Sequence, residues 1–545
     1  MFKQVFKKAF QHYLLECLFV YLLNPFLILR KRKEVTDIMM KWLKKKPKEQ
    51  SHTIDLSNNT YANIVELIDN AKDSADFIHY PQKTVHHNVY ISYYKAMIDG
   101  ELLHRDFLPY LIHSKDFKAL KDLKDILPIE SVTITNDIKE IQNKLLRGFI
   151  VVQFGEYDEE CAIVRAENFS TNRPVSVSEI EFSVIGPKEA FIENLDSNLY
   201  LIRRRLPVPE LRFKEIIIGK FSKTRVIIAY LEGIADKENI NTVTQRIKDI
   251  ESEVIPDSSY LEQMISDNTK SVFPQLVTTE RPDRVVSMLN YGQVAILSEG
   301  SPQALLGPTG ITEYFVSPED YYLSWVLGSL FRFIRFISVI FSTFATPIYV
   351  AVLTFHYQMI PKDLLAPLIS SRVNIPFPPI LEVLFLELTI ELLREAGARL
   401  PTKVGQTLGI VGGIVIGQAS VEAGLTSNIL LIIVSLSALA SFTTPIYKMA
   451  NTIRILRFPF IFLAAIWGGV GIVIAMSFIL VHLLRLESLG RPYMAPIYPP
   501  RLLDMTDTVI RLPYNRLLKR PISLSTQLPN KDKVKEMRKK KDIDE

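Results

Sequence analysis

An acidic segment carries the side chains best suited to ion chemistry. Within Pro379–Ala398, Glu387, Glu391 and Glu395 recur every four residues, so they share one face of a helix. Ionisable groups at membrane depth are costly and usually face a bundle interior or a water-filled path. We therefore expect Glu382, Glu387 or Glu391 to line or gate a path for cations.

The same segment has a second interpretation. Arg394 lies beside Glu391, and Arg399 follows Glu395 by one turn. Arg394, Glu395 and Arg399 are therefore expected to form ion pairs within the membrane, which would only hold the fold together. An interfacial helix with a solvated acidic face also fits, so the sequence leaves the ion path and the structural role open.

Four glycines mark a helix-packing face in the next apolar segment. Gly405, Gly409, Gly413 and Gly417 repeat every four residues. This spacing exposes the backbone along one side of a helix and lets a second helix approach closely. The second helix belongs either to the same chain or to another copy.

Motifs for enzyme chemistry are missing from the sequence. The stretch that begins at Gly219 ends like a phosphate-binding loop but lacks the glycine spacing of one. His86 and His87 have no metal-ligand spacing. Cys17 and Cys161 cannot build a disulfide framework or a cysteine-rich metal site. We expect no enzymatic activity, no cofactor and no metal site.

The composition indicates a soluble part joined to a membrane part. The 545 residues are 48% hydrophobic and 23% charged, and the mean hydropathy is positive. A net charge of +5 is too small to indicate a nucleic-acid partner. Predicted strands at 148–154, 161–165, 215–219 and 225–230 alternate with helical patterns. The expected fold class is a cytosolic α/β N-terminal domain of two lobes, followed by an α-helical polytopic membrane domain with four to five spans.

Changes of pattern divide the chain into five regions. They are a basic segment at 1–48, a helical lobe at 49–128, an α/β lobe at 129–318, a membrane domain at 319–485 and a polar, Pro-rich and charged tail at 486–545. The basic segment is either an amphipathic anchor or untranslated, in which case synthesis starts at Met39 or Met40.

The side of the membrane on which the tail lies depends on the acidic segment. A bilayer needs roughly 20 apolar residues, a length that four segments approach. They are 325–355, 405–421, 428–447 and 458–484. If 379–398 also crosses, the tail and the soluble domain lie on opposite sides; if it does not, they share one side. The basic loops fully satisfy neither arrangement, and we expect a cytoplasmic tail.

Particular stretches of the sequence point to a known family. In the membrane domain they begin at Glu391-Leu-Leu-Arg-Glu-Ala-Gly-Ala-Arg-Leu-Pro and at Gly409-Ile-Val-Gly-Gly-Ile-Val-Ile-Gly-Gln-Ala. The soluble region adds Glu280-Arg-Pro-Asp-Arg-Val, and the tail adds Gly490-Arg-Pro-Tyr-Met-Ala-Pro. With these motifs, residues 60 to 521 resemble the A subunits of bacterial spore nutrient-germinant receptors, the GerA-type family.

The resemblance implies a non-enzymatic receptor subunit in the inner membrane of the spore, with its N-terminal domain facing the spore core. The implied partners are a transporter-like B subunit, a lipoprotein C subunit, further copies of this chain and membrane lipid, but no nucleic acid. Nutrient binding would trigger the release of monovalent cations. We therefore expect the chain to oligomerise and to form or gate a cation path; the alternative is a non-conducting scaffold or signal relay.

Overall fold

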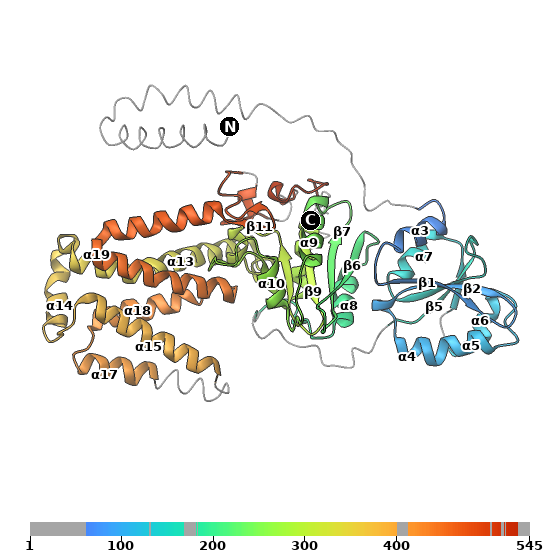
Figure 1. The fold of residues 1–545 in the computed structure, drawn as a ribbon, viewed down its shortest axis with the longest axis horizontal. Coiled ribbons are helices and arrows are strands. Elements are labelled where there is room, and N and C mark those ends of the chain that lie inside the picture. The colour runs from blue at the N-terminus through green and yellow to red at the C-terminus, as the bar shows by residue number, and fades with distance from the viewer. Residues whose placement is uncertain are drawn as a thin grey trace, which may run out of the picture. The chain divides into compact units, whose positions relative to one another are not determined.

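The computed structural model describes residues 61–129, 132–167, 181, 184–399, 412–501, 504–513, 517 and 519–531. The basic segment at 1–48, Gly405 and Gly409 lie outside the described residues. The described chain forms two α/β lobes, each built on an antiparallel sheet, and a helical part (Figure 1).

The first lobe is a sheet with helices on both faces. Its strands pair in the order β1-β2-β4-β5-β3. They are β1 (Phe77–Lys83), β2 (Asn88–Tyr94), β3 (Val132–Thr135), β4 (Phe149–Gln153) and β5 (Cys161–Arg165). Successive strand side chains point to opposite faces, so Val151 and Ile150 of β4 enter different cores.

The helices of the first lobe supply the other half of each core. Val151 packs with α3 (Ile64–Ala71) and α7 (Ile138–Leu145), whereas Ile150 packs with the helices between β2 and β3. Those helices are α4 (Gly100–Leu102), η3 (Leu103–Phe107), α5 (Leu108–His113), η4 (Leu120–Asp122) and α6 (Leu123–Ile126). The short η2 (Lys95–Met97) in the same stretch instead places Met97 in the core of Val151.

The first sheet crosses the domain boundary expected at residue 128. β1 and β2 lie within 49–128, the range expected to be a helical lobe, yet β2 pairs with β4. Helical spacing holds on either side of this hairpin, at α3 and at α6. The hairpin itself follows strand preferences, because β2 is rich in tyrosine and β-branched residues.

The second lobe confirms the strands predicted at 215–219 and 225–230. Its sheet has the order β6-β7-β9-β10-β8. The strands are β6 (Leu211–Ile218), β7 (Thr224–Leu231), β8 (Val277–Thr279), β9 (Val294–Ser298) and β10 (Ala304–Gly307). The helices are α8 (Leu195–Arg205), α9 (Lys237–Lys248), α10 (Ser258–Ile265), α11 (Pro282–Tyr291), η5 (Ile311–Phe315) and α12 (Glu319–Tyr322).

A buried ion pair connects the two lobes. Arg203 of α8 is fully buried and makes two hydrogen bonds to Asp76, at 2.8 and 2.9 Å. Its guanidinium also donates to the Leu211 carbonyl and lies over the rings of Tyr94 and Phe213. Two bonds to one carboxylate fix both distance and orientation, so this contact holds the start of β1 beside β6.

The helical part follows the second lobe. Its elements are α13 (Trp325–Thr354), η6 (Tyr357–Met359), α14 (Lys362–Arg372), α15 (Pro379–Arg399), η7 (Gly412–Ile416), α17 (Gly417–Glu422), α18 (Asn428–Ser441) and α19 (Tyr447–Arg485). Among the described residues, α13 and α19 are long and apolar enough to cross a bilayer. The expectation of four to five spans stays a prediction.

Helix α19 folds back on itself at Gly468. This residue has φ 59° and ψ −137°, a conformation that favours glycine. Beyond the break, Gly471 lies against the Leu463 carbonyl, and Gly469 N–H donates to His356 Nε2. The region expected as a single span at 458–484 therefore forms parts of two arms (Figure 1). Glycine permits a reversal that average hydropathy does not register.

The tail returns to the second lobe. Its elements are β11 (Glu487–Ser488), β12 (Arg491–Pro492), η8 (Asp504–Asp507) and η10 (Ile522–Leu524). Leu489 joins the core of the second lobe, and Arg491 pairs with Asp236 at 2.6 Å. Arg332 of α13 pairs with both Asp320 and the tail residue Asp507. The described part of the tail is thus a component of the second lobe.

Replacing Arg203 tests the contact between the lobes. We expect Arg203→Met to lower the free energy of unfolding by about 3–5 kcal/mol, because Asp76 stays buried without its cation. Arg204→Met on the same helix is the control: Arg204 is exposed and pairs with Glu189, so we expect a loss of at most about 1 kcal/mol. Equal losses in denaturant unfolding of the purified chain would contradict the assignment.

Candidate functional site

Helix α15 carries the acidic residues and packs against α13, α18 and α19. It begins at Pro379, a residue favoured in the first turn because no intrahelical acceptor awaits its missing N–H. Val383 and Leu386 are buried in the apolar core of the helical part. The same face carries Glu382 and Glu387 inward, so packing decides which acids are buried.

Glu382 is buried and paired. Its side chain has no exposed surface, and Arg372 of α14 donates to its Oε1 at 2.7 Å. The second oxygen, Oε2, has no hydrogen-bond partner among the described residues. The pair ties the short helix α14 to the first turn of α15.

Glu387 joins three helices at one level. Its side chain is 5% exposed, and Arg457 of α19 donates to Oε2 at 2.5 Å. The same guanidinium donates to Ser342 Oγ of α13 at 2.8 Å. Removing either charge would leave the other buried in a low-dielectric environment, which is strongly destabilising. The geometry of Glu387 is that of a structural ion pair.

Glu391 differs from the other two acids. Its side chain is 44% exposed, and its nearest cations, Arg454 and Arg394, lie at 3.6 and 3.9 Å. These distances exceed those of hydrogen-bonded pairs, so the carboxylate is held loosely. Of the three acids expected to line a path, Glu391 has the exposed carboxylate.

The expected ion-pair residues divide into two environments. Arg394 lies over the Phe442 ring and donates to Ser441 Oγ, so it connects α15 to the end of α18. Glu395 and Arg399 pair with each other one turn apart, and both side chains are largely exposed. An exposed pair of this kind contributes about 0–1 kcal/mol.

The described glycines of the packing face have different surroundings. Gly417 lies against Leu431 of α18, whose methyl carbons would be 3.6 Å from a Cβ atom added to the glycine. Gly413 has open space where a side chain would be. Packing within the chain therefore accounts for Gly417, and Gly413 stays available to another helix.

Sequence reasoning missed the arginines that pair with the acids. Arg454 and Arg457 lie between the apolar segments expected at 428–447 and 458–484, where the sequence favours a loop. In the structure they lie on the first arm of α19, opposite Glu391 and Glu387. The spacing of these residues is a signal that could have indicated the pairing. Arg454 and Arg457 are three residues apart, Glu387 and Glu391 are four apart, and either spacing places two side chains on one face of a helix. Among the described residues, no group of three or more His, Cys, Asp or Glu residues could hold a metal ion.

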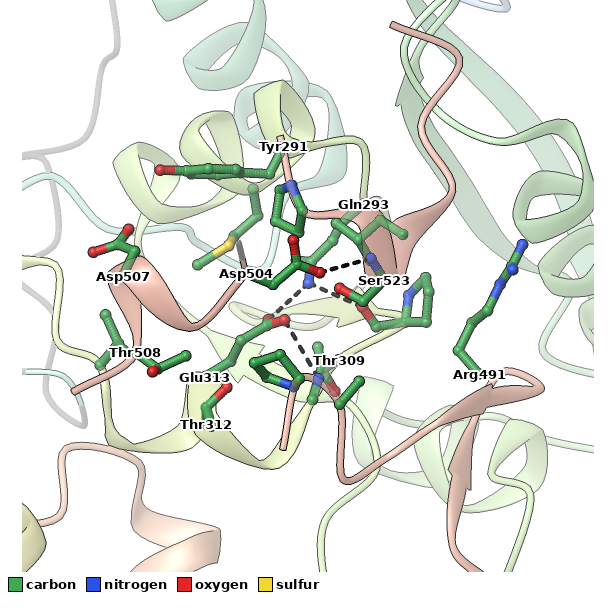
Figure 2. A pocket seen from close by; sticks show the side chains of 18 of the residues that line it. Tyr291, Gln293, Thr309, Thr312, Glu313, Arg491, Asp504, Asp507, Thr508 and Ser523 are labelled. Carbon is green, nitrogen blue, oxygen red and sulfur yellow. Dashed lines mark hydrogen bonds between the residues drawn. The ribbon is translucent and has the colours of Figure 1, made fainter. Parts of the chain in front are cut away.

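A second cluster of polar groups lies between the second lobe and the tail. Figure 2 shows Glu313, Gln293 and Asp504 around a small cavity of about 110 Å³. Gln293 donates to Glu313 Oε2 at 2.7 Å, and the Ser523 N–H donates to Asp504 at 3.0 Å. Burial raises the pKa of the Glu313 carboxyl to about 7, although Gln293 and the Gly310 N–H oppose the shift.

Comparison with known proteins relates the chain to spore germination proteins. Residues 65–523 match a family described as Bacillus/Clostridium GerA spore germination protein. Spore germination protein GerQA of Bacillus cereus is 48% identical over 467 residues, which are 86% of this chain and 93% of the relative. Spore germination protein A1 of Bacillus subtilis (strain 168) is 42% identical over 424 residues, 78% of this chain and 87% of the relative.

A solved structure is also similar. It is the crystal structure of the N-terminal domain of the A subunit of the Bacillus megaterium spore germinant receptor GerK3. The match has 24% identity and a TM-score of 0.32, and covers 45% of this chain and 92% of that one.

The raised pKa of Glu313 predicts a pH dependence of stability. A carboxyl whose folded pKa exceeds its unfolded value of 4.5 stabilises the fold fully below about pH 4.5, and this contribution is lost as pH rises through about 7. We expect Glu313→Gln, which stays neutral, to be more stable than the wild type by roughly 1–3 kcal/mol at pH 8 and similar at pH 5. Thermal unfolding at both pH values measures this; the same difference at both would contradict it.

Proposed function

This chain belongs to the GerA family of spore germination proteins, and from that premise we propose that it is the membrane subunit of a spore nutrient-germinant receptor. We further propose that it oligomerises and that α15 forms or gates a path for monovalent cations. The observation that carries the proposal is the half-exposed carboxylate of Glu391, which is held loosely. The two buried acids of the same helix, Glu382 and Glu387, are tightly paired.

The buried pairs define the part of α15 that stays fixed. Glu382 and Glu387 are neutralised by Arg372 and Arg457, so they present no free charge to a cation. Glu391 is placed to exchange Arg454 for a cation when the helices shift. An exposed carboxylate of this kind attracts cations and excludes anions.

One copy of α15 cannot enclose a path, so the proposal includes several copies. Leu388 and Leu392, on the outward side of α15, are 53% and 70% exposed. Gly413 offers a surface on which another helix can approach closely. Both features support contacts with a neighbouring copy or with a partner subunit in the membrane.

The alternative function is a non-conducting scaffold or relay. It is favoured by the contacts of Glu387, which link α13, α15 and α19 in the manner of a structural ion pair. In that case cations would move through another subunit, and the acids would be needed for assembly alone.

We place this receptor in the inner membrane of the spore, with a transporter-like B subunit and a lipoprotein C subunit as partners. The soluble lobes would lie on the cytoplasmic side. The contacts of Arg332 and Arg491 with the second lobe and the tail support the same side for both. The chain would then cross the membrane an even number of times, because both ends of the helical part lie on one side.

Replacement of single acids separates conduction from assembly. In spores that carry this receptor alone, we expect Glu391→Gln to slow nutrient-triggered potassium release at least about fivefold at normal receptor level, since it removes the exposed charge. Glu395→Gln is the matched control and should release potassium normally, because its carboxylate pairs with Arg399 at an exposed position. Unchanged release in Glu391→Gln would favour the scaffold.

Glu387→Gln has a different expected effect. It leaves Arg457 buried without its carboxylate, so less receptor should accumulate in the membrane. Adding Arg457→Gln removes the second charge and should restore the receptor level. A normal level in the single variant would contradict the structural role given to this pair.

Labelling of single cysteines tests the side on which the tail lies. We expect Lys519→Cys in the tail and Lys248→Cys in the second lobe to resist a membrane-impermeant maleimide in intact cells and to react after lysis. Asp363→Cys in α14, near the opposite end of α13, should react in intact cells. All three positions are exposed within the chain, and the native Cys161 is buried; Cys17 is replaced by serine in every variant. Opposite labelling of Lys519→Cys and Lys248→Cys would overturn the even number of crossings.

A further inference from the structure

The second lobe and the tail enclose a larger cavity of about 420 Å³. α11 supplies Tyr291, the α12 region supplies Tyr321 and Tyr322, and the tail supplies Arg520 and Lys531. Tyr291 also borders the smaller cavity, at the end where Figure 2 places Asp507. A volume of this size is typical of sites for small molecules.

Positive charge dominates the tail side of this cavity. The Lys531 ammonium lies 3.6 Å from the centre of the Tyr291 ring. Burial, and then the charge of Arg520, lower the pKa of Lys531 to about 8, and Asp507 opposes this shift without cancelling it. Asp507 already accepts hydrogen bonds from Arg332 and from the Tyr321 hydroxyl. The field at Lys531 therefore favours an additional negative charge.

The other charged groups of the wall are matched within the second lobe. Asp283 accepts hydrogen bonds from Arg281 and from the Tyr322 hydroxyl, at 2.8 and 2.7 Å. Arg284 pairs with Glu181 at 2.9 Å. Its buried Nε has no hydrogen-bond partner among the described residues. Because this nitrogen has no accessible surface, the Lys531 ammonium is the charged donor that the cavity offers to a ligand.

We propose that this cavity binds a small oxyanion, a carboxylate or a phosphate, with Lys531 as its principal charged contact. An oxyanion accepts several hydrogen bonds, and those from a charged donor are about twice as strong as neutral ones. The site lies in the soluble part of the chain and is independent of any cation path along α15. Its ligand would join the tail to α11, because Lys531 and Tyr291 come from these two elements.

Bound anion should also change how Lys531 titrates. Without an anion, the folded chain holds this proton less tightly than the unfolded chain between about pH 8 and the ordinary lysine value of 10.5. Below pH 8 Lys531 is already protonated, so an anion meets the ammonium directly and stabilises the folded chain most strongly there. Above pH 8 the anion must also restore the proton, so its stabilising effect declines. Above pH 10 the ammonium is lost and so is the main attraction.

The test uses the full chain purified in detergent, with sodium phosphate and sodium acetate as separate probes. At pH 7 we expect one of them to raise the unfolding temperature of the wild type by about 2–4 °C beyond sodium chloride of equal ionic strength. Lys531→Gln should raise the half-saturating concentration at least about tenfold. Lys519→Gln removes an exposed charge from the same tail and should respond like the wild type.

The two probes identify the ligand chemistry. A response to phosphate alone indicates a phosphate site, and a response to acetate alone indicates a carboxylate site. The proposal is overturned if neither salt exceeds chloride, if Lys531→Gln responds like the wild type, or if the response at pH 10 equals that at pH 7. None of these readouts depends on ion release, so they are separate from the tests of conduction.

Discussion

A carboxylate among apolar helices must meet a cation or lose its charge, and this constraint arranges the helical part of the chain. Glu387 meets Arg457, and Arg457 also meets Ser342, so three helices are held at one level. One turn along α15, Glu391 comes to face Arg454 on the same arm of α19. The first pair therefore sets the register of the second. Glu391 lies at a more exposed position than Glu387, so its carboxylate stays accessible.

The same constraint joins the helical part to the soluble part. Arg332 is fully buried near the start of α13, and it pairs with Asp320 before the helix and with Asp507 in the tail. The buried guanidinium of Arg332 keeps both carboxylates close to it. Its pair with Asp507 therefore holds the tail at the end of α13 that adjoins the second lobe. The helices between Arg332 and Asp507 must therefore lead away from the second-lobe end of α13 and then return to it.

Local patterns predict the elements of this fold better than they predict its pairings. The strands at 215–219 and 225–230 follow from short β-branched runs, and α15 follows from its own periodicity. Arg457 could not be assigned to Glu387 because 70 residues separate them, and an arginine beside an apolar segment fits a cytoplasmic loop equally well. The reversal at Gly468 escapes a hydropathy average because the residues on both sides are apolar.

The first arm of α19 connects the acidic helix to the second lobe. Lys448 pairs with Glu262 of α10, and Thr452 Oγ1 donates to the Val272 carbonyl. Arg454 and Arg457 follow on the same arm, so a shift of α10 would carry both guanidinium groups along α15. Glu391, with its longer distances, would lose its cation before Glu387 does. A partner that binds the shifted arm more tightly would thereby release the Glu391 carboxylate from Arg454. In the proposed cation path, Arg454 and Arg457 would then control the gate, and Glu391 would provide the charge.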